Sequence, residues 1–177
     1  CQEPFTIVQI LWINLIMDTL AALAFGEEPA LKRYMNEKPV PRKAHILTKY
    51  MKASIGTAAA FITIVCLCII MNIGNIQSLI IEPGVNEATA DGMIRTFMFS
   101  FFIYAVIFNS FNTRSSGYNL LEHVNENKKF LIVMGSIAII QTVIIQFGGE
   151  VLSTVPMSLN HFLLALLIAF LIIPVDM

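Results

Sequence analysis

The chain has 177 residues, of which 56% are hydrophobic and only 13% are charged, and its formal net charge is -1. Soluble domains are about 45–50% apolar and about 25% charged, so this composition excludes an ordinary water-soluble domain. It also excludes intrinsic disorder, and without an excess of Lys and Arg we expect no nucleic-acid partner.

Five segments stay apolar over the roughly 20 residues that a helix needs to cross a membrane. In chain order they are 5–25, 55–73, 93–111, 130–147 and 161–175. Continuous apolarity suits helices rather than barrel strands, in which apolar and polar residues alternate. The sequence therefore predicts an all-α integral membrane protein with five transmembrane helices and the lipid bilayer as its surroundings.

The positive charges predict the orientation of these helices. Seven of the eleven Lys and Arg residues lie in segment 26–54, and three more lie in segment 112–129. Short loops rich in Lys and Arg remain on the cytoplasmic side. We therefore expect both segments to be cytoplasmic loops, with the C-terminus in the cytoplasm as well.

The first segment is the only one with an acid near its middle. Asp18 lies there, and Asn14 precedes it by four residues, which places both on one face of a regular α-helix. A carboxylate at this depth costs at least about 2.5–3.5 kcal/mol and needs a partner. Two interpretations follow: a protonated Asp18 bonds to another helix, or Asn14 and Asp18 provide oxygen ligands to a hard cation such as Ca²⁺.

No catalytic motif accompanies this pair. The chain has no Gly-rich phosphate loop and no HExxH or Ser/His/Asp set, so we predict no catalytic residue within it. It begins with Cys1 rather than Met and ends just after its last apolar segment, so we expect it to be part of a longer protein.

Three stretches resemble a known family. Residues 9–29, QILWINLIMDTLAALAFGEEP, closely resemble the sixth transmembrane helix of calcium-transporting P-type ATPases, above all the plasma-membrane type. Residues 108–114, FNSFNTR, are similar to the end of the eighth helix, and residues 145–149, IQFGG, to the close of the ninth. The resemblance implies that residues 1–177 are helices six to ten of a ten-helix membrane domain.

The resemblance also implies a function. Asn14 and Asp18 match the helix-six ligands of the transported calcium, in a pump of the plasma membrane or, in a bacterium, of the inner membrane. ATP and magnesium bind to domains that lie outside this chain, and the preceding helices and cytoplasmic domains are its partners. Two-ion calcium pumps carry a Thr and a Glu where this chain has Met17 and Val106, which predicts a single transported ion.

Other interpretations stay open at this point. The chain could be a noncatalytic helical module, or part of a secondary transporter in which Asp18 relays a proton. A pump for another divalent cation such as manganese is a further alternative, because oxygen ligands suit several hard cations. For five other polar residues we expect hydrogen bonds that join helices: Tyr104, Asn109, Asn112, Gln141 and Gln146.

Overall fold

The computed structural model describes residues 3–26, 35–36, 41, 47–71, 77–114 and 127–176. The longer elements in these ranges are all helices, as the composition predicts. In chain order they are α1 (Ile7–Leu15), the π-helical η1 (Ile16–Ala21), α2 (Ala22–Gly26), α3 (Lys49–Met71), α4 (Gln77–Ile80), α5 (Glu87–Arg114), α6 (Lys128–Phe147), α7 (Gly149–Leu152), α8 (Leu159–Phe170) and α9 (Ile172–Asp176).

Five helical units in the described residues are long and apolar enough to cross a membrane, which confirms the predicted fold class. They are the continuous α1–η1–α2 unit, hereafter the first span, then α3, α5, α6 and the α8–α9 pair. Four begin earlier than hydropathy predicts, and the difference is largest for α3, which begins at Lys49, and for α5, which begins at Glu87. The first turns of these two helices are polar but capped, because Thr48 Oγ1 accepts from Met51 N (3.1 Å) and Asn86 Oδ1 accepts from Thr89 N (2.8 Å).

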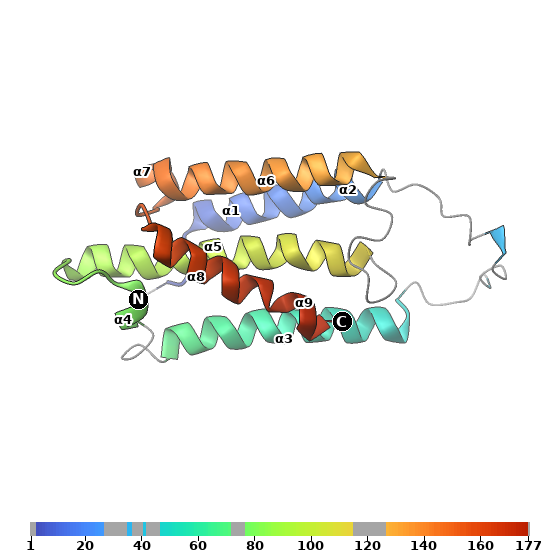
Figure 1. The fold of residues 1–177 in the computed structure, drawn as a ribbon, viewed down its shortest axis with the longest axis horizontal. Coiled ribbons are helices and arrows are strands. Elements are labelled where there is room, and N and C mark those ends of the chain that lie inside the picture. Colours follow the sequence, from blue (N-terminus) through green and yellow to red (C-terminus); the bar gives the residue numbers. More distant parts are fainter. Residues whose placement is uncertain are drawn as a thin grey trace.

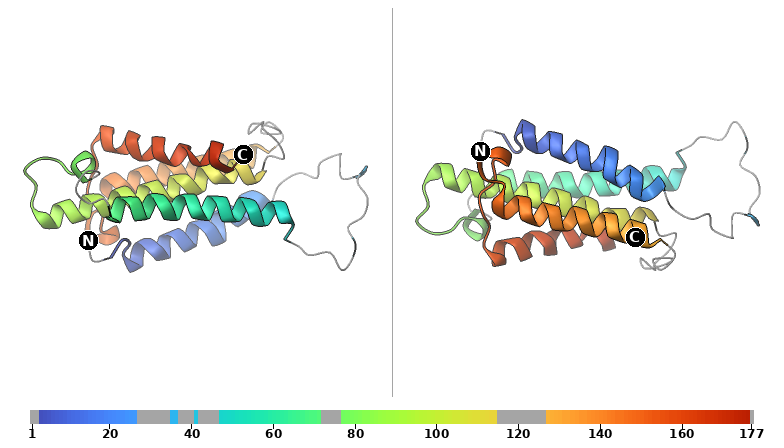
Figure 2. Two further views of the ribbon diagram at one scale, coloured as in Figure 1. Left: turned by 90° about the horizontal axis from the view of Figure 1, so that it is seen from below. Right: turned by 90° about the horizontal axis from the view of Figure 1, so that it is seen from above.

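Helix α5 lies at the centre of the bundle, and consecutive spans run in opposite directions (Figure 1). The first span lies beside α6, while α8 and α9 cross α5, and α3 packs against both α5 and α9. Figure 2 shows the first span and α8 on opposite sides of α5. The first span therefore lies at the edge of the bundle.

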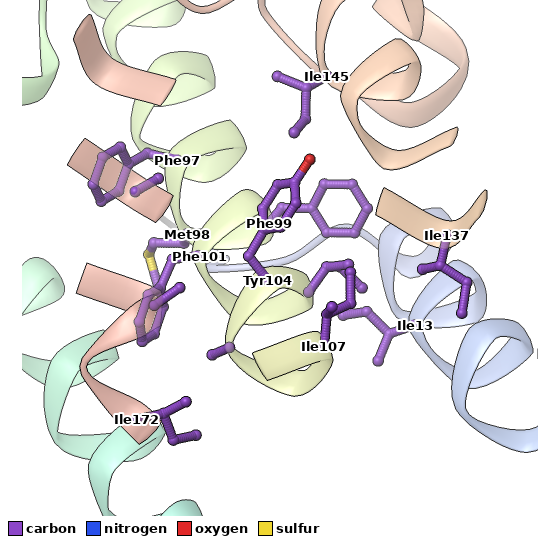
Figure 3. Close-up of a cluster of buried hydrophobic side chains, with 14 of the residues drawn as sticks. Ile13, Phe97, Met98, Phe99, Phe101, Tyr104, Ile107, Ile137, Ile145 and Ile172 are labelled. Atoms are coloured by element: carbon purple, nitrogen blue, oxygen red, sulfur yellow. The ribbon is translucent and has the colours of Figure 1, made fainter. Parts of the chain in front are cut away.

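The core is built around the aromatic residues of α5. Phe97, Met98, Phe99 and Phe101 are fully buried there, and Figure 3 shows Ile13 of the first span reaching the same cluster. Edge-to-face ring contacts continue it toward α8, with Tyr104 against Phe162 (5.6 Å) and Phe108 against Phe170 (5.6 Å) between ring centroids. Because lipid tails are as apolar as these side chains, close packing of this kind holds membrane helices together.

Polar contacts fasten the last short helix to its neighbours. Asp176 accepts hydrogen bonds from Ser54 Oγ (2.8 Å) and Thr57 Oγ1 (2.6 Å) of α3. From α5, Asn112 Nδ2 donates to the carbonyl oxygens of Ile172 (3.2 Å) and Ile173 (3.3 Å). These bonds satisfy backbone and carboxylate groups at the end of the bundle where the first span ends and α3 begins (Figure 1).

Candidate functional site

The two predicted ligands lie in the first span, on different kinds of helix. Asn14 belongs to α1, and its side chain is exposed rather than packed against the other helices. The backbone of Asp18 belongs to the π-helical η1, and its side chain lies outside the part that the structure describes. The structure thus places Asn14 on the outer surface of the bundle and Asp18 four residues farther along the same span.

The π-helical segment lies around Asp18 itself. In η1, which runs from Ile16 to Ala21, backbone bonds span five residues instead of four, so the helix widens there. The hydroxyl of Thr19 donates to the carbonyl oxygen of Leu15, inside the same turn. Because the turn widens, the angle between Asn14 and Asp18 differs from that of the regular α-helix assumed from the sequence. Single π-helical turns inside α-helices are frequent at functional sites.

Two hydrogen bonds fix the rotation of α1 about its own axis. Gln9 is fully buried, and its Nε2 donates to the carbonyl oxygen of Leu152 (3.0 Å) in the turn after α6. One turn later, Trp12 Nε1 donates to Oε1 of the buried Gln141 on α6 (3.1 Å). Successive helical residues are rotated by about 100°, so fixing Trp12 inward turns Asn14 outward.

The start of α1 reinforces this anchor. Thr6 and Gln9 form a capping box, in which Thr6 Oγ1 accepts from Gln9 N (3.3 Å) and Gln9 Oε1 accepts from Thr6 N (3.1 Å). The turn that holds Leu152 follows Gly148, where an added Cβ would lie 2.5 Å from the carbonyl oxygen of Ile144. Glycine at this position therefore lets the turn fold tightly against the end of the first span that carries Gln9.

Beyond this anchored half, the first span borders a cavity of about 330 Å³ that it shares with α5 and α6. Ile16 and Ala21, the two ends of η1, both contribute to its wall, and so does Val106 of α5. Among the described residues, the lining is formed by Ile16, Ala21, Ala22, Phe25, Val106, Ile107, Asn109, Ser110, Thr113, Met134 and Ile137. The π-helical turn that carries Asp18 therefore borders a space that no described side chain fills.

Most of the predicted interhelical hydrogen bonds are present. Tyr104 OH contacts Ala138 O (3.1 Å) and Thr142 Oγ1 (2.7 Å) on α6. Gln146 Nε2 instead donates to Met157 O (2.9 Å) in the loop before α8, so it joins a helix to a loop rather than to another helix. Asn112 and Gln141 also join helices, as described above. The prediction is wrong for Asn109, whose buried Oδ1 has no hydrogen-bond partner within the described residues.

The pairing of Trp12 with Gln141 could not be identified from spacing, because the two residues are 129 positions apart. The sequence shows a Gln inside an apolar helix, which predicts a hydrogen bond to another helix but does not identify the partner. In the described part of the chain, no three His, Cys, Asp or Glu side chains gather closely enough to hold a metal ion.

Comparison with known proteins gives one family over nearly the whole chain. Residues 2–177 match the family model described as "Cation transporting ATPase, C-terminus". The chain is 33% identical to "Calcium-transporting ATPase 5, plasma membrane-type" of Oryza sativa subsp. japonica, over 94% of this chain and 15% of that protein. It is 36% identical to "Calcium-transporting ATPase 4, plasma membrane-type" of Arabidopsis thaliana, over 95% of this chain and 16% of that protein. The chain thus spans about a sixth of the length of these relatives.

Proposed function

The chain belongs to the family of cation-transporting ATPase C-terminal regions, and from that membership we propose that it is the membrane part of an ATP-driven calcium export pump. In this proposal Asn14 and Asp18 bind the transported calcium. The observation that carries the proposal is the arrangement of the first span. Trp12 fixes one face of this span to α6, while the side chain of Asn14 is exposed and Asp18 belongs to the π-helical turn that follows.

The chemistry of the two side chains supports calcium as the ion. Ca²⁺ takes about six to eight oxygen ligands, including carboxylates and amide carbonyls. Asn14 and Asp18 provide oxygens of both kinds, and the names of the two relatives describe calcium transport. Two side chains do not fill such a shell, so upstream helices of the full-length pump supply the remaining ligands.

The exposed face of the first span supports a partner in the same protein. Ile7 is 83% exposed and Leu11 67% exposed, on the same outer surface as Asn14. A polar amide facing lipid is costly, whereas one facing another helix or an ion is stabilised. The preceding helices of the pump cover this face, and its ATP and magnesium bind to cytoplasmic domains upstream.

Basic residues support the orientation of the membrane part. Lys49, Lys52, Arg114, Lys128 and Lys129 all belong to the end of the bundle where α3 and α6 begin. Because Lys and Arg near helix ends stay on the cytoplasmic side, this end faces the cytoplasm. The pump lies in the plasma membrane, with the end of α9 on the same cytoplasmic side.

The test is Asp18→Asn in the full-length pump, which keeps the size of the side chain and removes its charge. Phosphorylation from ATP should require at least about 100-fold more calcium, because a charged ligand is lost in a low-dielectric site. Phosphorylation from inorganic phosphate, measured without calcium, should persist. Glu150→Gln, which removes an exposed charge from α7, is the matched control and should behave as wild type.

Three results would contradict the proposal. If the wild-type protein forms no calcium-dependent phosphoenzyme, the pump itself is not a calcium ATPase. If manganese but not calcium supports phosphorylation, the ion is different. If Asp18→Asn leaves the calcium requirement unchanged, Asp18 only joins helices.

A further inference from the structure

An aromatic cluster holds the end of the first span that lies beside the start of α6 (Figure 1). Phe130 of α6 lies at the centre of this cluster and is fully buried. The centroid of its ring lies 5.7 Å from that of Phe25 in α2 and 5.2 Å from that of Phe111 in α5. One ring of α6 therefore joins the end of the first span to the end of α5.

The Phe130 ring is itself held in place by several contacts. The guanidinium carbon of Arg114 lies 5.0 Å from the ring centroid, a distance typical of a cation–π interaction. The backbone of Phe130 is fixed as well, because its N–H donates to Oδ1 of the buried Asn127 (2.9 Å), which caps α6. A ring held by Arg114, by Phe111 and through its own backbone is a firm support for Phe25.

The same face of α6 carries a second support for the first span. The buried residues of α6 recur at helical spacing and so lie along one face: Phe130, Met134, Ile137, Gln141 and Ile145. Gln141 accepts the hydrogen bond of Trp12, which precedes the π-helical turn. Phe130 packs against Phe25, which follows the turn. Helix α6 thus holds the span on both sides of η1, and two of the residues between these supports line the cavity beside the turn.

The two supports together determine the rotation of the backbone at Asp18. A π-helical turn contains more residues than an α-helical turn, so it changes the direction of every residue that follows it. Trp12 fixes the rotation of the span before the turn, and Phe25 fixes it after the turn. With both ends fixed, the backbone between them is held at one twist.

We propose that Phe130 is a positioning residue for the transported calcium, and that it acts by fixing the rotation of the first span beyond the π-helical turn. This inference rests on the proposed function, in which Asn14 and Asp18 bind the ion, and it names the residue that holds the far end of their helix. Phe130 does not bind the ion, because calcium takes oxygen ligands and an aromatic ring has none. Its loss changes the geometry of the site and leaves the ligands in place.

The test uses the full-length pump with Phe130→Ala, which removes the ring and its contact with Phe25. We expect half-maximal phosphorylation from ATP to need about tenfold more calcium, which is the scale of one lost aromatic pair. Phosphorylation from inorganic phosphate, measured without calcium, should persist. A loss of stability alone would lower both reactions together and would leave the calcium requirement of the folded pump unchanged.

Phe101→Ala is the matched control. Phe101 is as fully buried as Phe130, but its ring contact is with Phe61 of α3 rather than with Phe25. Its calcium requirement should stay within about twofold of wild type, even though the pump loses stability. An equal rise in Phe101→Ala and Phe130→Ala would overturn the inference, because the loss of any core ring would then have this effect.

Phe25→Ala removes the same contact from the other side and completes a double-mutant cycle. Phe25 is 38% exposed, so its loss disturbs the core less than the loss of Phe130 does. We expect it to raise the calcium requirement severalfold. The double variant should need about as much calcium as Phe130→Ala alone, because the shared contact can be lost only once.

Two results of this cycle would contradict the positioning role. One is a double variant in which the two fold-changes multiply, because the two rings would then act separately. The other is an unchanged calcium requirement in the folded Phe130→Ala pump or in Phe25→Ala. If Phe130→Ala does not fold, Phe25→Ala decides the question by itself.

The proposed function and this inference fail in different ways. If wild type forms no calcium-dependent phosphoenzyme, or if Asp18→Asn leaves the calcium requirement unchanged, the proposed function fails. If Asp18→Asn raises the requirement while Phe130→Ala and Phe25→Ala match wild type, only the positioning role of Phe130 fails.

Discussion

Helix α5 and the first span are both apolar helices of the same bundle, but they are packed very differently. In the apolar stretch of α5, 67% of the residues are buried inside the described structure, whereas the corresponding value for the first span is 25%. Helix α5 packs against α3, α6, α8 and α9. The first span is held from one side, through Gln9 and Trp12.

This difference indicates that α5 supports the bundle, whereas the first span carries the candidate ion ligands. A helix with most of its residues buried presents little surface on which to bind an ion, but it can fix the positions of its neighbours. The first span keeps a free surface, and its π-helical turn lies next to a cavity rather than in a close-packed interior. We therefore expect substitutions in α5 to affect stability first and substitutions in the first span to affect the calcium requirement first.

The expectation that α5 determines stability is tested most strongly by Phe101→Ala. Phe101 is fully buried in α5, and its ring centroid lies 6.4 Å from that of Phe61 in α3. Removing a buried aromatic ring costs about 3–5 kcal/mol, largely through the cavity it leaves. The midpoint of thermal inactivation of the full-length pump in detergent should fall accordingly.

Phe147→Ala provides the matched control for this substitution. It removes the same ring from the end of α6, where the side chain is 83% exposed. Its midpoint should stay close to that of wild type. Equal losses for Phe101→Ala and Phe147→Ala would show that α5 is no more central to stability than the surface of α6.

A smaller effect is expected where the scaffold orients the site. Gln141→Leu removes the acceptor of the Trp12 hydrogen bond and leaves the indole N–H of Trp12 without this partner. The first span can then rotate, and Asn14 loses its fixed direction. We expect the calcium concentration for half-maximal phosphorylation to rise about tenfold, while the calcium-free reaction with inorganic phosphate persists.

Gln146→Leu separates orientation from general damage to α6. It removes a glutamine from the same helix, but Gln146 donates its hydrogen bond to the carbonyl oxygen of Met157 rather than to the first span. Its calcium requirement should match that of wild type. If Gln146→Leu raises the requirement as much as Gln141→Leu does, the Trp12 bond has no special role in the site.

The sequence predicted the fold class because hydropathy reports burial in lipid directly. Helix ends were predicted less well, since Lys49 and Glu87 begin their helices with polar turns that hydropathy cannot distinguish from loops. Capping side chains were the missing signal, with Thr48 and Asn86 placed just ahead of those helices. The helix of a membrane span can therefore begin several residues before its apolar stretch does.

The candidate site shows a similar division. Asn14 and Asp18 were identified because polar side chains are rare inside a membrane helix. The π-helical turn could not be predicted, because hydropathy and residue spacing do not distinguish a π-helical turn from a regular α-helix. The unsatisfied oxygen of Asn109 also required the structure, because spacing alone predicted an ordinary interhelical bond there.

The central claim is that the first span binds the transported calcium, and calcium occlusion tests it most directly. The amount of calcium trapped per phosphoenzyme should be measured in the full-length wild-type pump and in Asp18→Asn. Our account predicts about one ion per phosphoenzyme in wild type, because Val106 supplies no ligand for a second, and almost none in the variant. A value near two in wild type would contradict the single-ion site, and unchanged occlusion in Asp18→Asn would contradict the claim that this span binds the ion.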